Sequence, residues 1–377
     1  MNRTEKNKQI NKTIILSGGG TGGSITPLLA LAEELWRENK NLNLIFVGNY
    51  SGPEKEMVAA FNNQTGPMKF IPLISGKWRR YFSWQNFWDI FKIITAYFQS
   101  FILLRRERPD LILSAGGFVS VPLVLAAAFL KIPILIHQQD IRPGLANKLM
   151  APFARVVTVT FAKSLLDYGS KAVWIGNPVK QLSKDHQETS IEMIKNKYNL
   201  DTKKPLVLIT GGGTGSHKIN DLIFRGIPEL IKFCQIIHLT GSGKLLIEKI
   251  YSSDYHPLEI VSYQDSLELI RAADLVVSRC GLGTLAELSS LNKAAILIPL
   301  PNSHQEDNAA IFSEAQAAVV LNQNELTPEK LAEEIKRLLN NEPLKNELKN
   351  NIAKVIKRGA VQGLVGIIGE VLSSQKS

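Results

Sequence analysis

Glycine-rich segments lie at residues 17–24, 211–216 and 278–287 of this sequence, each after an apolar run. The backbone N–H groups of such a turn, with the positive end of the following helix dipole, can stabilise a diphosphate. The first two lack the GxxxxGK of a Walker A loop, and the chain has no Asp-x-Asp motif for a metal-bound diphosphate. We therefore expect metal-independent binding of a nucleotide sugar. Taken singly, each segment also fits a tight strand-to-helix turn.

Gly18, Gly20 and Gly23 match the GxGxxG pattern of dinucleotide-binding folds. Such folds place an acidic residue at the end of the second strand, where it binds a ribose. Here the second strand-like run ends at Val47 and is followed by Gly48. This disfavours NAD, and we expect neither a cofactor nor a metal.

Polar side chains suited to a sugar nucleotide gather in the C-terminal half. Glu287 could accept hydrogen bonds from a ribose diol, or it could form a capping box with Thr284. The stretch 301–308 supplies four amide or imidazole groups that could bind sugar hydroxyls. The alternative is a polar loop with a helix cap formed by Ser303 and Glu306.

The elements that must position these residues alternate between strands and helices. The apolar run 13–16, the first glycine-rich segment and a helix from Pro27 are repeated roughly 190 residues later by 206–210, the second segment and a helix over 219–230. Further strands are expected at 44–47, 111–113, 134–136, 156–159, 236–239, 275–277 and 295–298. The pattern predicts an α/β fold of two Rossmann-like domains, whose parallel sheets bind ligands at the carboxyl ends of their strands.

Glycine, proline and polar residues suggest the domain boundaries. We predict an N-terminal acceptor and membrane-binding domain over 1–175, a linker over 176–204 and a C-terminal UDP-sugar domain over 205–350. A C-terminal helix over 351–377 is expected to pack back on the N-terminal domain. Two domains facing each other across a cleft would suit a two-substrate transfer.

Composition narrows the classes of partner. The 377 residues, 45% of them apolar, can form two cores. Lys and Arg number 44 against 34 Asp and Glu, and the net charge of +10 favours nucleic acid, acidic lipids or phosphorylated ligands. Cys234 and Cys280 lack disulfide-framework or zinc spacing, and the first ten residues lack the apolar segment of a signal peptide. We expect a cytoplasmic protein.

One segment combines tryptophan with basic residues. It contains Trp78, Arg79, Arg80, Tyr81, Phe82 and Trp84, and a helical pattern follows from Gln85. Asp89 and Lys92 argue against a transmembrane span and fit an interfacial helix, although a core helix with a solvated stripe is the alternative. The mixture of aromatic and cationic residues favours contact with an anionic membrane surface.

Seven ordered motifs together resemble the MurG family, the undecaprenyl-diphospho-muramoylpentapeptide β-N-acetylglucosaminyltransferases of glycosyltransferase family 28. The motifs are 18–23, 115–120, 137–140 with 144–148, 176–179, 211–215, 278–287 and 304–309. The resemblance implies a GT-B fold and inverting transfer of GlcNAc from UDP-GlcNAc to the muramoyl 4-hydroxyl of lipid I, which gives lipid II in peptidoglycan synthesis. The implied partners are UDP-GlcNAc, the lipid-linked diphosphate acceptor and the cytoplasmic face of an anionic membrane, rather than nucleic acid.

The resemblance also implies site residues. The residues implied to bind the donor are Gly212, Gly213, Thr214, Tyr263, Arg279, Gly281, Glu287, Gln305, Asn308 and Lys180. Among them, Glu287 is expected at the ribose, Tyr263 near uracil, and Gln305 and Asn308 at the sugar. Acceptor or phosphate binding falls to Gly19, Gly20, Thr21, Gly22, Gly23, Ser24, Gly116, Gly117 and Asn147. Membrane binding falls to Trp78, Arg79, Arg80, Phe82 and Trp84.

The sequence departs from the family pattern at three places: Ser24 replaces the usual histidine, Gln138 a common glutamate and Lys180 an arginine. An unassisted serine hydroxyl is too weak a base near neutral pH, so the general base is expected to be Asp140 or His137, which follow the strand 134–136. We favour Asp140, because desolvation can raise the pKa of a carboxylate toward neutrality. His137 also fits a structural histidine.

Three alternative functions stay open. The chain could be a transferase of the same fold with another lipid acceptor, such as a diacylglycerol. It could be a UDP-sugar epimerase, which shares the two-domain architecture. It could also be a non-catalytic UDP-sugar-binding protein, an alternative suggested by the departures from the family pattern at Ser24 and Gln138.

Overall fold

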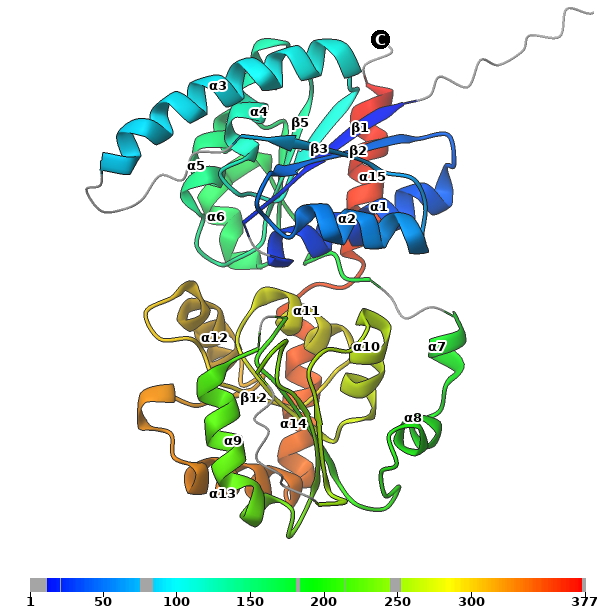
Figure 1. Cartoon of the computed structure of the whole chain (residues 1–377), viewed down its shortest axis with the longest axis vertical. Helices are drawn as coiled ribbons and strands as arrows, with labels where there is room; N and C mark the ends of the chain where they lie inside the picture. Colours follow the sequence, from blue (N-terminus) through cyan, green and yellow to red (C-terminus); the bar gives the residue numbers. More distant parts are fainter. Residues whose placement is uncertain are drawn as a thin grey trace, which may run out of the picture. The chain divides into compact units, whose positions relative to one another are not determined.

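The computed structural model describes residues 12–20, 22–74, 84–180, 184–213, 215–244 and 252–374, without the side chains of 84–90 and 184–185. The chain divides into two compact units (Figure 1). The first unit comprises Met1–Gln139, Pro143–Lys180 and Gly359–Ser377, and the second comprises Asp140–Arg142 and Gln181–Arg358. Each unit is built around its own parallel sheet.

The described strands of the first unit form a seven-stranded parallel sheet in the order β3-β2-β1-β4-β5-β6-β7. Their bounds are β1 Thr13–Ser17, β2 Asn43–Asn49, β3 Lys69–Leu73, β4 Leu111–Ser114, β5 Ile134–Gln138, β6 Val156–Val159 and β7 Ala172–Trp174. The sequence predicted five of them and missed the edge strands β3 and β7. These two are only partly buried, β7 has three residues, and β3 contains Pro72, which an edge strand tolerates.

Helices cover both faces of this sheet. Their bounds are α1 Gly22–Glu38, α2 Glu54–Gln64, α3 Trp84–Glu107, α4 Ser120–Phe129, α5 Leu145–Met150, α6 Leu165–Tyr168 and α15 Ala360–Ser373, with 3-10 turns η1 Ala151–Phe153, η2 Ala162–Ser164 and η3 Gly169–Lys171. Ile14 and Leu16 on β1 pack in one core with α1, α2 and α15, whereas Ile15 packs in a second core with α3, α4 and α5. The alternation of side chains along one strand thus serves both layers.

The described strands of the second unit form a six-stranded parallel sheet in the order β10-β9-β8-β11-β12-β13. Their bounds are β8 Leu206–Thr210, β9 Gln235–Leu239, β10 Tyr255–Leu258, β11 Leu275–Ser278, β12 Ala295–Leu297 and β13 Val319–Val320. The helices are α7 Lys184–Glu188, α8 Ile191–Lys197, α9 His217–Leu230, α10 Tyr263–Ala272, α11 Leu282–Ser290, α12 His304–Glu314, α13 Pro328–Leu339 and α14 Glu342–Val355, with the turn η4 Gln323–Glu325. One core joins α9, α13 and α14 to this sheet. The prediction of an α/β fold with two Rossmann-like domains is confirmed.

Two segments differ in detail from the sequence prediction. The predicted linker contains α7 and α8, both in the second unit. The predicted C-terminal helix contains the end of α14, a break at Gly359 with φ +78° and then α15, which contacts α1 in the first unit. Gly359 is the N-cap of α15, and glycine adopts this left-handed conformation without steric cost.

Three further observations concern the described residues of both units. No described helix has both the length and the apolarity needed to cross a bilayer. Among the described residues, no group of His, Cys, Asp and Glu side chains has the arrangement of a metal site. Cys234 and Cys280 are buried free thiols in different elements.

Candidate functional site

The glycine-rich turn after β1 forms the start of α1, five residues before the predicted start at Pro27. Gly20 has φ +92°, and the Ser24 hydroxyl donates a hydrogen bond to the carbonyl of Gly19 at 3.2 Å. Gly22 and Gly23 open the helix, where the first backbone N–H groups have no partner within the helix. The turn therefore offers N–H donors to an anion.

Two further loops meet this turn at the carboxyl edge of the first sheet. A Cβ added to Gly117, which has φ +96°, would lie 2.7 Å from the carbonyl oxygen of Gly19. Gly116 has φ +95° and faces the Asn147 side chain, whose Oδ1 would lie 3.1 Å from an added Cβ. Glycine is thus required at both positions. The structure brings together Gly19, Gly116, Gly117 and Asn147, as the acceptor-site prediction needs.

A buried carboxylate that the sequence analysis missed lies against the same turn. Glu54 opens α2, is fully buried and accepts a hydrogen bond from the Gly20 N–H through Oε1 at 2.9 Å. Its Oε2 is buried without a hydrogen-bond partner among the described residues. A Cβ at Gly19, Gly48 or Gly52 would overlap this side chain. The only sequence signal was the pair of glycines before an acidic helix start, which is common in other contexts.

His137 is fully buried at the end of β5. Its Nδ1 lies 3.0 Å from the Thr158 hydroxyl, and its Nε2 lies 3.1 Å from Oδ1 of Asn177. Because an amide oxygen only accepts, we assign the proton to Nε2. Burial lowers the pKa of His137 to about 4, although the hydrogen bond to Asn177 opposes the shift. This geometry holds a neutral imidazole inside the first unit.

Gln138 also belongs to a closed polar group. Its Oε1 accepts hydrogen bonds from Asn147 Nδ2 at 2.7 Å and from the Tyr168 hydroxyl at 3.0 Å. Burial raises the pKa of Tyr168, so this hydroxyl stays a donor near neutral pH. A carboxylate at position 138 would accept the same two bonds, and the amide present here still satisfies both donors. Sequence reasoning missed Tyr168, which belongs to none of the seven motifs.

Residues 140–142 group with the second unit. Asn308 Nδ2 donates to Asp140 Oδ1 at 3.1 Å, and the N–H of Ile141 donates to Asn308 Oδ1 at 3.4 Å. Arg142 forms an ion pair with Asp307 at 2.7 Å. Asp140 therefore lies beside a residue predicted to bind the donor sugar.

The second unit has two glycine turns at the carboxyl edge of its sheet. An added Cβ at Gly212 (φ +81°), Gly213 or Gly281 would meet open space, so these residues face no neighbouring side chain. Gly215 has φ +68°, and a Cβ there would overlap the carbonyl oxygen of Thr240. Gly215 is thus required by the close approach of two loops, and Gly212 by its left-handed backbone. The open turns suit a bulky phosphorylated ligand.

Arg279 joins these two turns. The side chain is buried, and its guanidinium donates to the carbonyls of Ile298 at 3.0 Å and Pro299 at 3.1 Å. It also donates to the hydroxyl of Ser216, the N-cap of α9, at 2.8 Å and to Gln323. Burial lowers its pKa from the ordinary value. The cation supports the turn before α9 from within, where it adds positive potential.

Glu287 on α11 and Tyr263 at the start of α10 are neighbours. Burial raises the pKa of Glu287 to about 7, and the nearby Tyr263 side chain opposes this shift. The alternative interpretation of Glu287 as part of a capping box was wrong: the N-cap of α11 is Gly281, and both Thr284 and Glu287 lie inside the helix. Glu287 is thus a partly exposed acid with no capping role.

Gln305 and Asn308 lie on α12 and bind the turn before α11. Gln305 Oε1 accepts hydrogen bonds from the N–H groups of Cys280 at 3.3 Å and Leu300 at 3.1 Å. Asn308 Nδ2 also donates to the carbonyl of Cys280 at 3.4 Å. Ser303 caps α12, as one of the two interpretations of this loop predicted.

The remaining predicted residues lie elsewhere or outside the described structure. Lys180 belongs to the first unit and pairs with Glu33 at 3.0 Å, and its role at the donor stays a prediction. Thr21, Thr214, Trp78, Arg79, Arg80, Tyr81, Phe82 and the side chain of Trp84 are outside the described residues.

Comparison with known proteins covers both units. The profile of the glycosyltransferase family 28 N-terminal domain matches residues 14–159, and that of the C-terminal domain matches residues 206–363. A Clostridium kluyveri protein named UDP-N-acetylglucosamine–N-acetylmuramyl-(pentapeptide) pyrophosphoryl-undecaprenol N-acetylglucosamine transferase is 37% identical over 87% of this chain and 91% of its own length.

Solved structures share the fold. Acinetobacter baumannii MurG has a TM-score of 0.72 and 24% identity, covering 95% of this chain and 99% of its own. A Neisseria meningitidis UDP-GlcNAc 2-epimerase bound to UDP-GlcNAc has a TM-score of 0.68 and 14% identity, covering 96% and 100%. The fold alone thus fits both a transferase and an epimerase, whereas the sequence separates them. The chain belongs to glycosyltransferase family 28, and within it to the family of UDP-N-acetylglucosamine–N-acetylmuramyl-(pentapeptide) pyrophosphoryl-undecaprenol N-acetylglucosamine transferases.

Proposed function

We propose that this enzyme transfers GlcNAc from UDP-GlcNAc to the 4-hydroxyl of undecaprenyl-diphospho-MurNAc-pentapeptide, with inversion, and so forms lipid II. The observation that carries the proposal is the similarity over nearly the whole chain to relatives named for this reaction. The product places the enzyme in peptidoglycan synthesis, and through it in cell-wall growth, cell shape and division.

The donor is assigned to the second unit. Its open glycine turns, with Gly212 and Gly213 before α9 and Gly281 before α11, offer N–H groups to the diphosphate. Glu287 accepts hydrogen bonds from the ribose hydroxyls, and Tyr263 lies beside it at the uracil end. The side-chain nitrogen of Gln305 donates to the sugar hydroxyls, and the fully buried Asn308 supports this part of the site through its bonds to Asp140 and Cys280. This donor set contains no metal-ligand cluster among the described residues, and the diphosphate is neutralised by backbone dipoles.

The acceptor is assigned to the first unit. The first turn of α1 and the loop at Gly116 and Gly117 supply N–H donors to the lipid diphosphate, and Ser24 adds a hydroxyl. The Gly20 N–H is already bonded to Glu54, so the phosphate donors are the N–H groups nearer the helix.

Asp140 is proposed as the general base. It takes the proton from the acceptor 4-hydroxyl as that oxygen bonds to the anomeric carbon, while the bond from that carbon to the UDP oxygen breaks and UDP leaves. The amide of Asn308 orients the carboxylate, and it comes from a helix assigned to the donor sugar. His137 is disfavoured, because it is fully buried and both ring nitrogens already have protein partners.

An exposed apolar stripe on α3 supports binding at a membrane surface. Phe91, Ile94, Phe98 and Ile102 recur every three or four residues and are 49–66% exposed. Phe129 extends the stripe, since its ring packs edge to face against the ring of Phe101. The guanidinium of Arg105 lies over the ring of Phe101, 4.7 Å from its centre.

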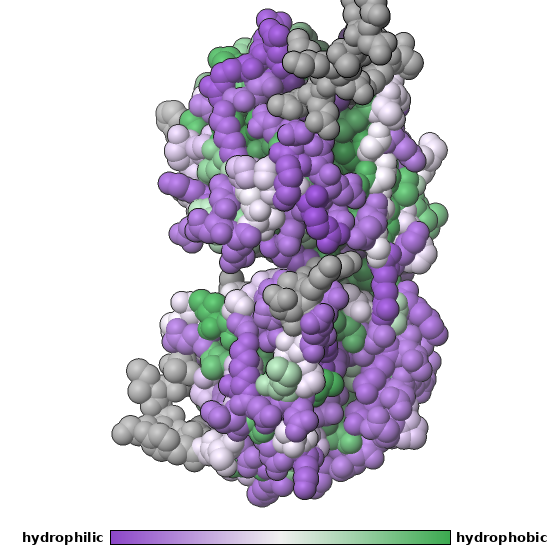
Figure 2. Space-filling model, turned by 90° about the vertical axis from the view of Figure 1, so that its right-hand side faces the viewer, coloured by the Kyte–Doolittle hydropathy of each residue, from purple (hydrophilic) through white to green (hydrophobic). Residues whose placement is uncertain are grey.

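Apolar residues beside cations favour an anionic lipid surface. The face of the molecule in Figure 2 is, by contrast, mostly hydrophilic over both units. We assign the α3 stripe to the cytoplasmic face of the cell membrane, in addition to the predicted segment at 78–84.

An acceptor panel tests the proposed function. The enzyme is incubated with UDP-GlcNAc alone, with lipid I, or with a diacylglycerol, and sugar products and released UDP are quantified. UDP release that depends on lipid I is expected. UDP-ManNAc formed without acceptor would identify an epimerase, and transfer to the diacylglycerol alone would assign another lipid product.

A further inference from the structure

One peptide bond at the start of the first glycine turn is held from both sides. The N–H of Gly20 donates to Oε1 of Glu54 at 2.9 Å, and the carbonyl of Gly19 accepts from the Ser24 hydroxyl at 3.2 Å. Because this N–H and this carbonyl belong to the same planar peptide unit, they point in opposite directions. Glu54 and Ser24 together therefore fix the orientation of the unit, which we call the clamped peptide.

The glycines on either side would otherwise let the clamped peptide turn over. Glycine enters left-handed and right-handed conformations about equally well, and Gly20 has φ +92°. A Cβ added at Gly20 would meet no atom of the described residues within 4 Å. Hydrogen bonds, rather than packing around Gly20, therefore select the orientation that the turn adopts.

This orientation matters for two loops at once. A Cβ added to Gly117 would lie 2.7 Å from the carbonyl oxygen of Gly19 and 2.8 Å from its nitrogen, so the two loops are in close contact. Further along the chain, the clamped peptide leads into α1, which starts at Gly22. Turning the peptide over would move the Gly19 carbonyl away from its place against Gly117 and would redirect the N–H groups that open α1. The clamped peptide thus lies between the two sets of N–H donors that are assigned to the lipid diphosphate.

Glu54 is enclosed tightly enough to serve as a fixed hydrogen-bond acceptor. It is fully buried at the first position of α2, where the helix dipole favours a negative charge. Added Cβ atoms at Gly48 and Gly52 would overlap its side chain, so the surrounding backbone closes around the carboxylate. Its Oε2 is buried without a hydrogen-bond partner among the described residues. Because an unpaired oxygen of a buried carboxylate lowers stability, stability alone does not account for this residue.

We propose that Glu54 and Ser24 are positioning residues of the acceptor site. By fixing the clamped peptide, they align the start of α1 with the loop at Gly117, so that both present their N–H groups to the lipid diphosphate. A serine hydroxyl has one proton, and Ser24 donates it to Gly19, so this hydroxyl acts on the acceptor through the clamped peptide. The proposal rests on the proposed function, because it takes this turn as the diphosphate site of the acceptor.

Acceptor kinetics of the full-length enzyme test the proposal. The concentration of lipid I is varied in detergent micelles at saturating UDP-GlcNAc, and UDP affinity is measured separately by calorimetry. Glu54→Ala and Ser24→Ala should each raise the acceptor KM about threefold to tenfold, which is the range of one hydrogen bond. The kcat should stay within about twofold of the wild-type value and UDP affinity should not change, because the donor site and the reacting atoms are untouched.

The double variant separates an indirect role from direct contacts with the phosphate. Because losing either partner frees the same peptide, combining Glu54→Ala with Ser24→Ala should give an acceptor KM within about twofold of the worse single variant. Two independent contacts with the phosphate would multiply their effects instead. Amide hydrogen exchange of residues 18–24, measured by mass spectrometry without substrate, should be faster in both single variants, because the clamped peptide is then free to turn over.

Two control variants make the result specific. Glu54→Gln keeps an oxygen that accepts from the Gly20 N–H, so its acceptor KM should stay close to the wild-type value. Asn62→Ala acts on the same helix α2, where it removes two hydrogen bonds to the backbone of Met68, at 2.9 and 3.0 Å. It should leave the acceptor KM and the exchange of residues 18–24 unchanged.

Multiplied effects in the double variant overturn the proposal, as does unchanged hydrogen exchange in the single variants. An equal rise of the acceptor KM in Asn62→Ala overturns it too, since that is a general effect of weakening α2. Ser24 is only half-buried, so Ser24→Ala decides the question if Glu54→Ala does not fold. If the wild-type enzyme does not use lipid I, the proposed function fails and this proposal falls with it. Wild-type turnover of lipid I with an unmoved acceptor KM in the variants refutes the positioning role alone.

Discussion

Glu287 should make the preference for the ribose hydroxyls depend on pH near neutrality. Its pKa is raised to about 7, because burial outweighs the opposing effect of Tyr263. A carboxylate accepts hydrogen bonds from two hydroxyls more strongly than the protonated acid does, so binding favours the ionised form. The preference for UDP over 2′,3′-dideoxy-UDP should therefore be greatest above pH 7 and should decline below it.

The size of the effect follows from the pKa and from the strength of a charged hydrogen bond. At pH 5 only about 1% of a group with a pKa near 7 is ionised. A hydrogen bond to a charged group contributes about 1.5–3 kcal/mol, which corresponds to about 10- to 150-fold in affinity. We expect the UDP preference to fall by about tenfold to a hundredfold between pH 8 and pH 5. The ratio removes the titration of the phosphates.

The matched variant is Glu287→Gln, which keeps the shape and loses the charge. Its UDP preference should be low and independent of pH. Calorimetry near pH 6.5 in two buffers of different ionisation enthalpy should show more proton release when UDP binds to the wild-type protein than when it binds to the variant, because only the phosphate titrates in the variant. A wild-type preference that stays constant from pH 5 to 8 would refute the reasoning, as would equal proton release by the two proteins.

The same residue carries a cost in stability. Since its pKa in the folded protein is raised from 4.5 to about 7, the native state binds the proton more tightly than the unfolded chain does. The wild-type protein is therefore penalised as pH rises from 4.5 through 7, and fully so above 7. Glu287→Gln should be more stable by about 1–3 kcal/mol at pH 8 and about equal at pH 4.5, measured by urea unfolding without ligand. Equal stabilities at pH 8 would show that the carboxyl is not desolvated.

Other outcomes concern the acceptor side. Asp140→Asn should lower kcat by about 10²–10⁴ with unchanged UDP affinity, whereas His137→Gln should act mainly on stability; full turnover by Asp140→Asn would exclude it as the base. Glu54→Ala should raise the acceptor KM severalfold without changing UDP affinity. Glu54→Gln keeps an oxygen that accepts from the Gly20 N–H, so its acceptor KM should be close to that of the wild-type enzyme. An equal rise of the acceptor KM in both variants would contradict this positioning role. Replacing Phe98 and Ile102 by serine should weaken sedimentation with anionic vesicles, and unchanged sedimentation would remove the stripe from the membrane contact.

Much of the fold was predictable because central parallel strands are buried on both faces and read as continuous apolar runs. The runs that became β1 and β8, each with a glycine turn after it, are the clearest cases. The edge strands β3 and β7 were missed, because β7 is very short and β3 contains a proline, which argues against a central strand. Pro27 led to a wrong start for α1, because proline is typical of the first turn of a helix, whereas here it lies inside the helix.

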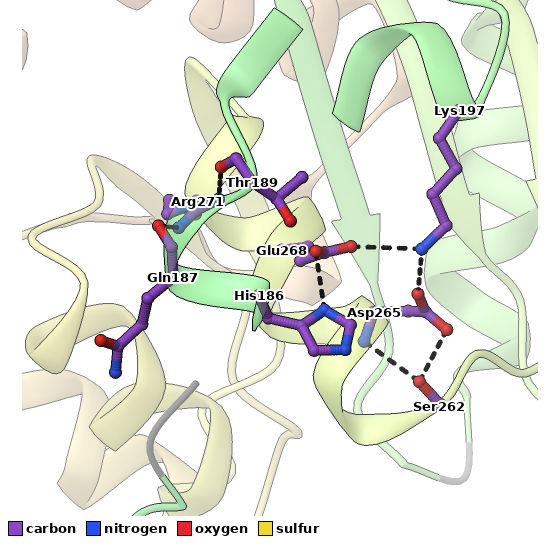
Figure 3. Close-up of polar contacts among 8 residues, drawn as sticks. All are labelled: His186, Gln187, Thr189, Lys197, Ser262, Asp265, Glu268 and Arg271. Atoms are coloured by element: carbon purple, nitrogen blue, oxygen red, sulfur yellow. Dashed lines mark hydrogen bonds and ion pairs between the residues drawn. The ribbon is translucent and has the colours of Figure 1, made fainter. Parts of the chain in front are cut away.

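Candidate site residues could be named from the sequence where they lie in a motif. Glu287, Gly117 and Asn308 lie in such motifs, and their roles stay predictions. Glu54 and Tyr168 were missed, because their importance comes from contacts with residues more than 29 positions away in the chain. The helices α7 and α8 were assigned to a linker for the same reason: the acid Glu268, which binds His186 and Lys197 (Figure 3), lies on α10, far along the sequence.

The identity of the product tests the proposed function most directly. The purified enzyme is incubated with UDP-GlcNAc and lipid I in anionic vesicles, and the lipid product is analysed by mass spectrometry and by the proton coupling of the new anomeric centre. We predict a single lipid-linked GlcNAc-MurNAc disaccharide with a β-1,4 linkage and one UDP released per transfer. An α-linked product, or UDP-GlcNAc consumption without any lipid-linked disaccharide, would contradict it.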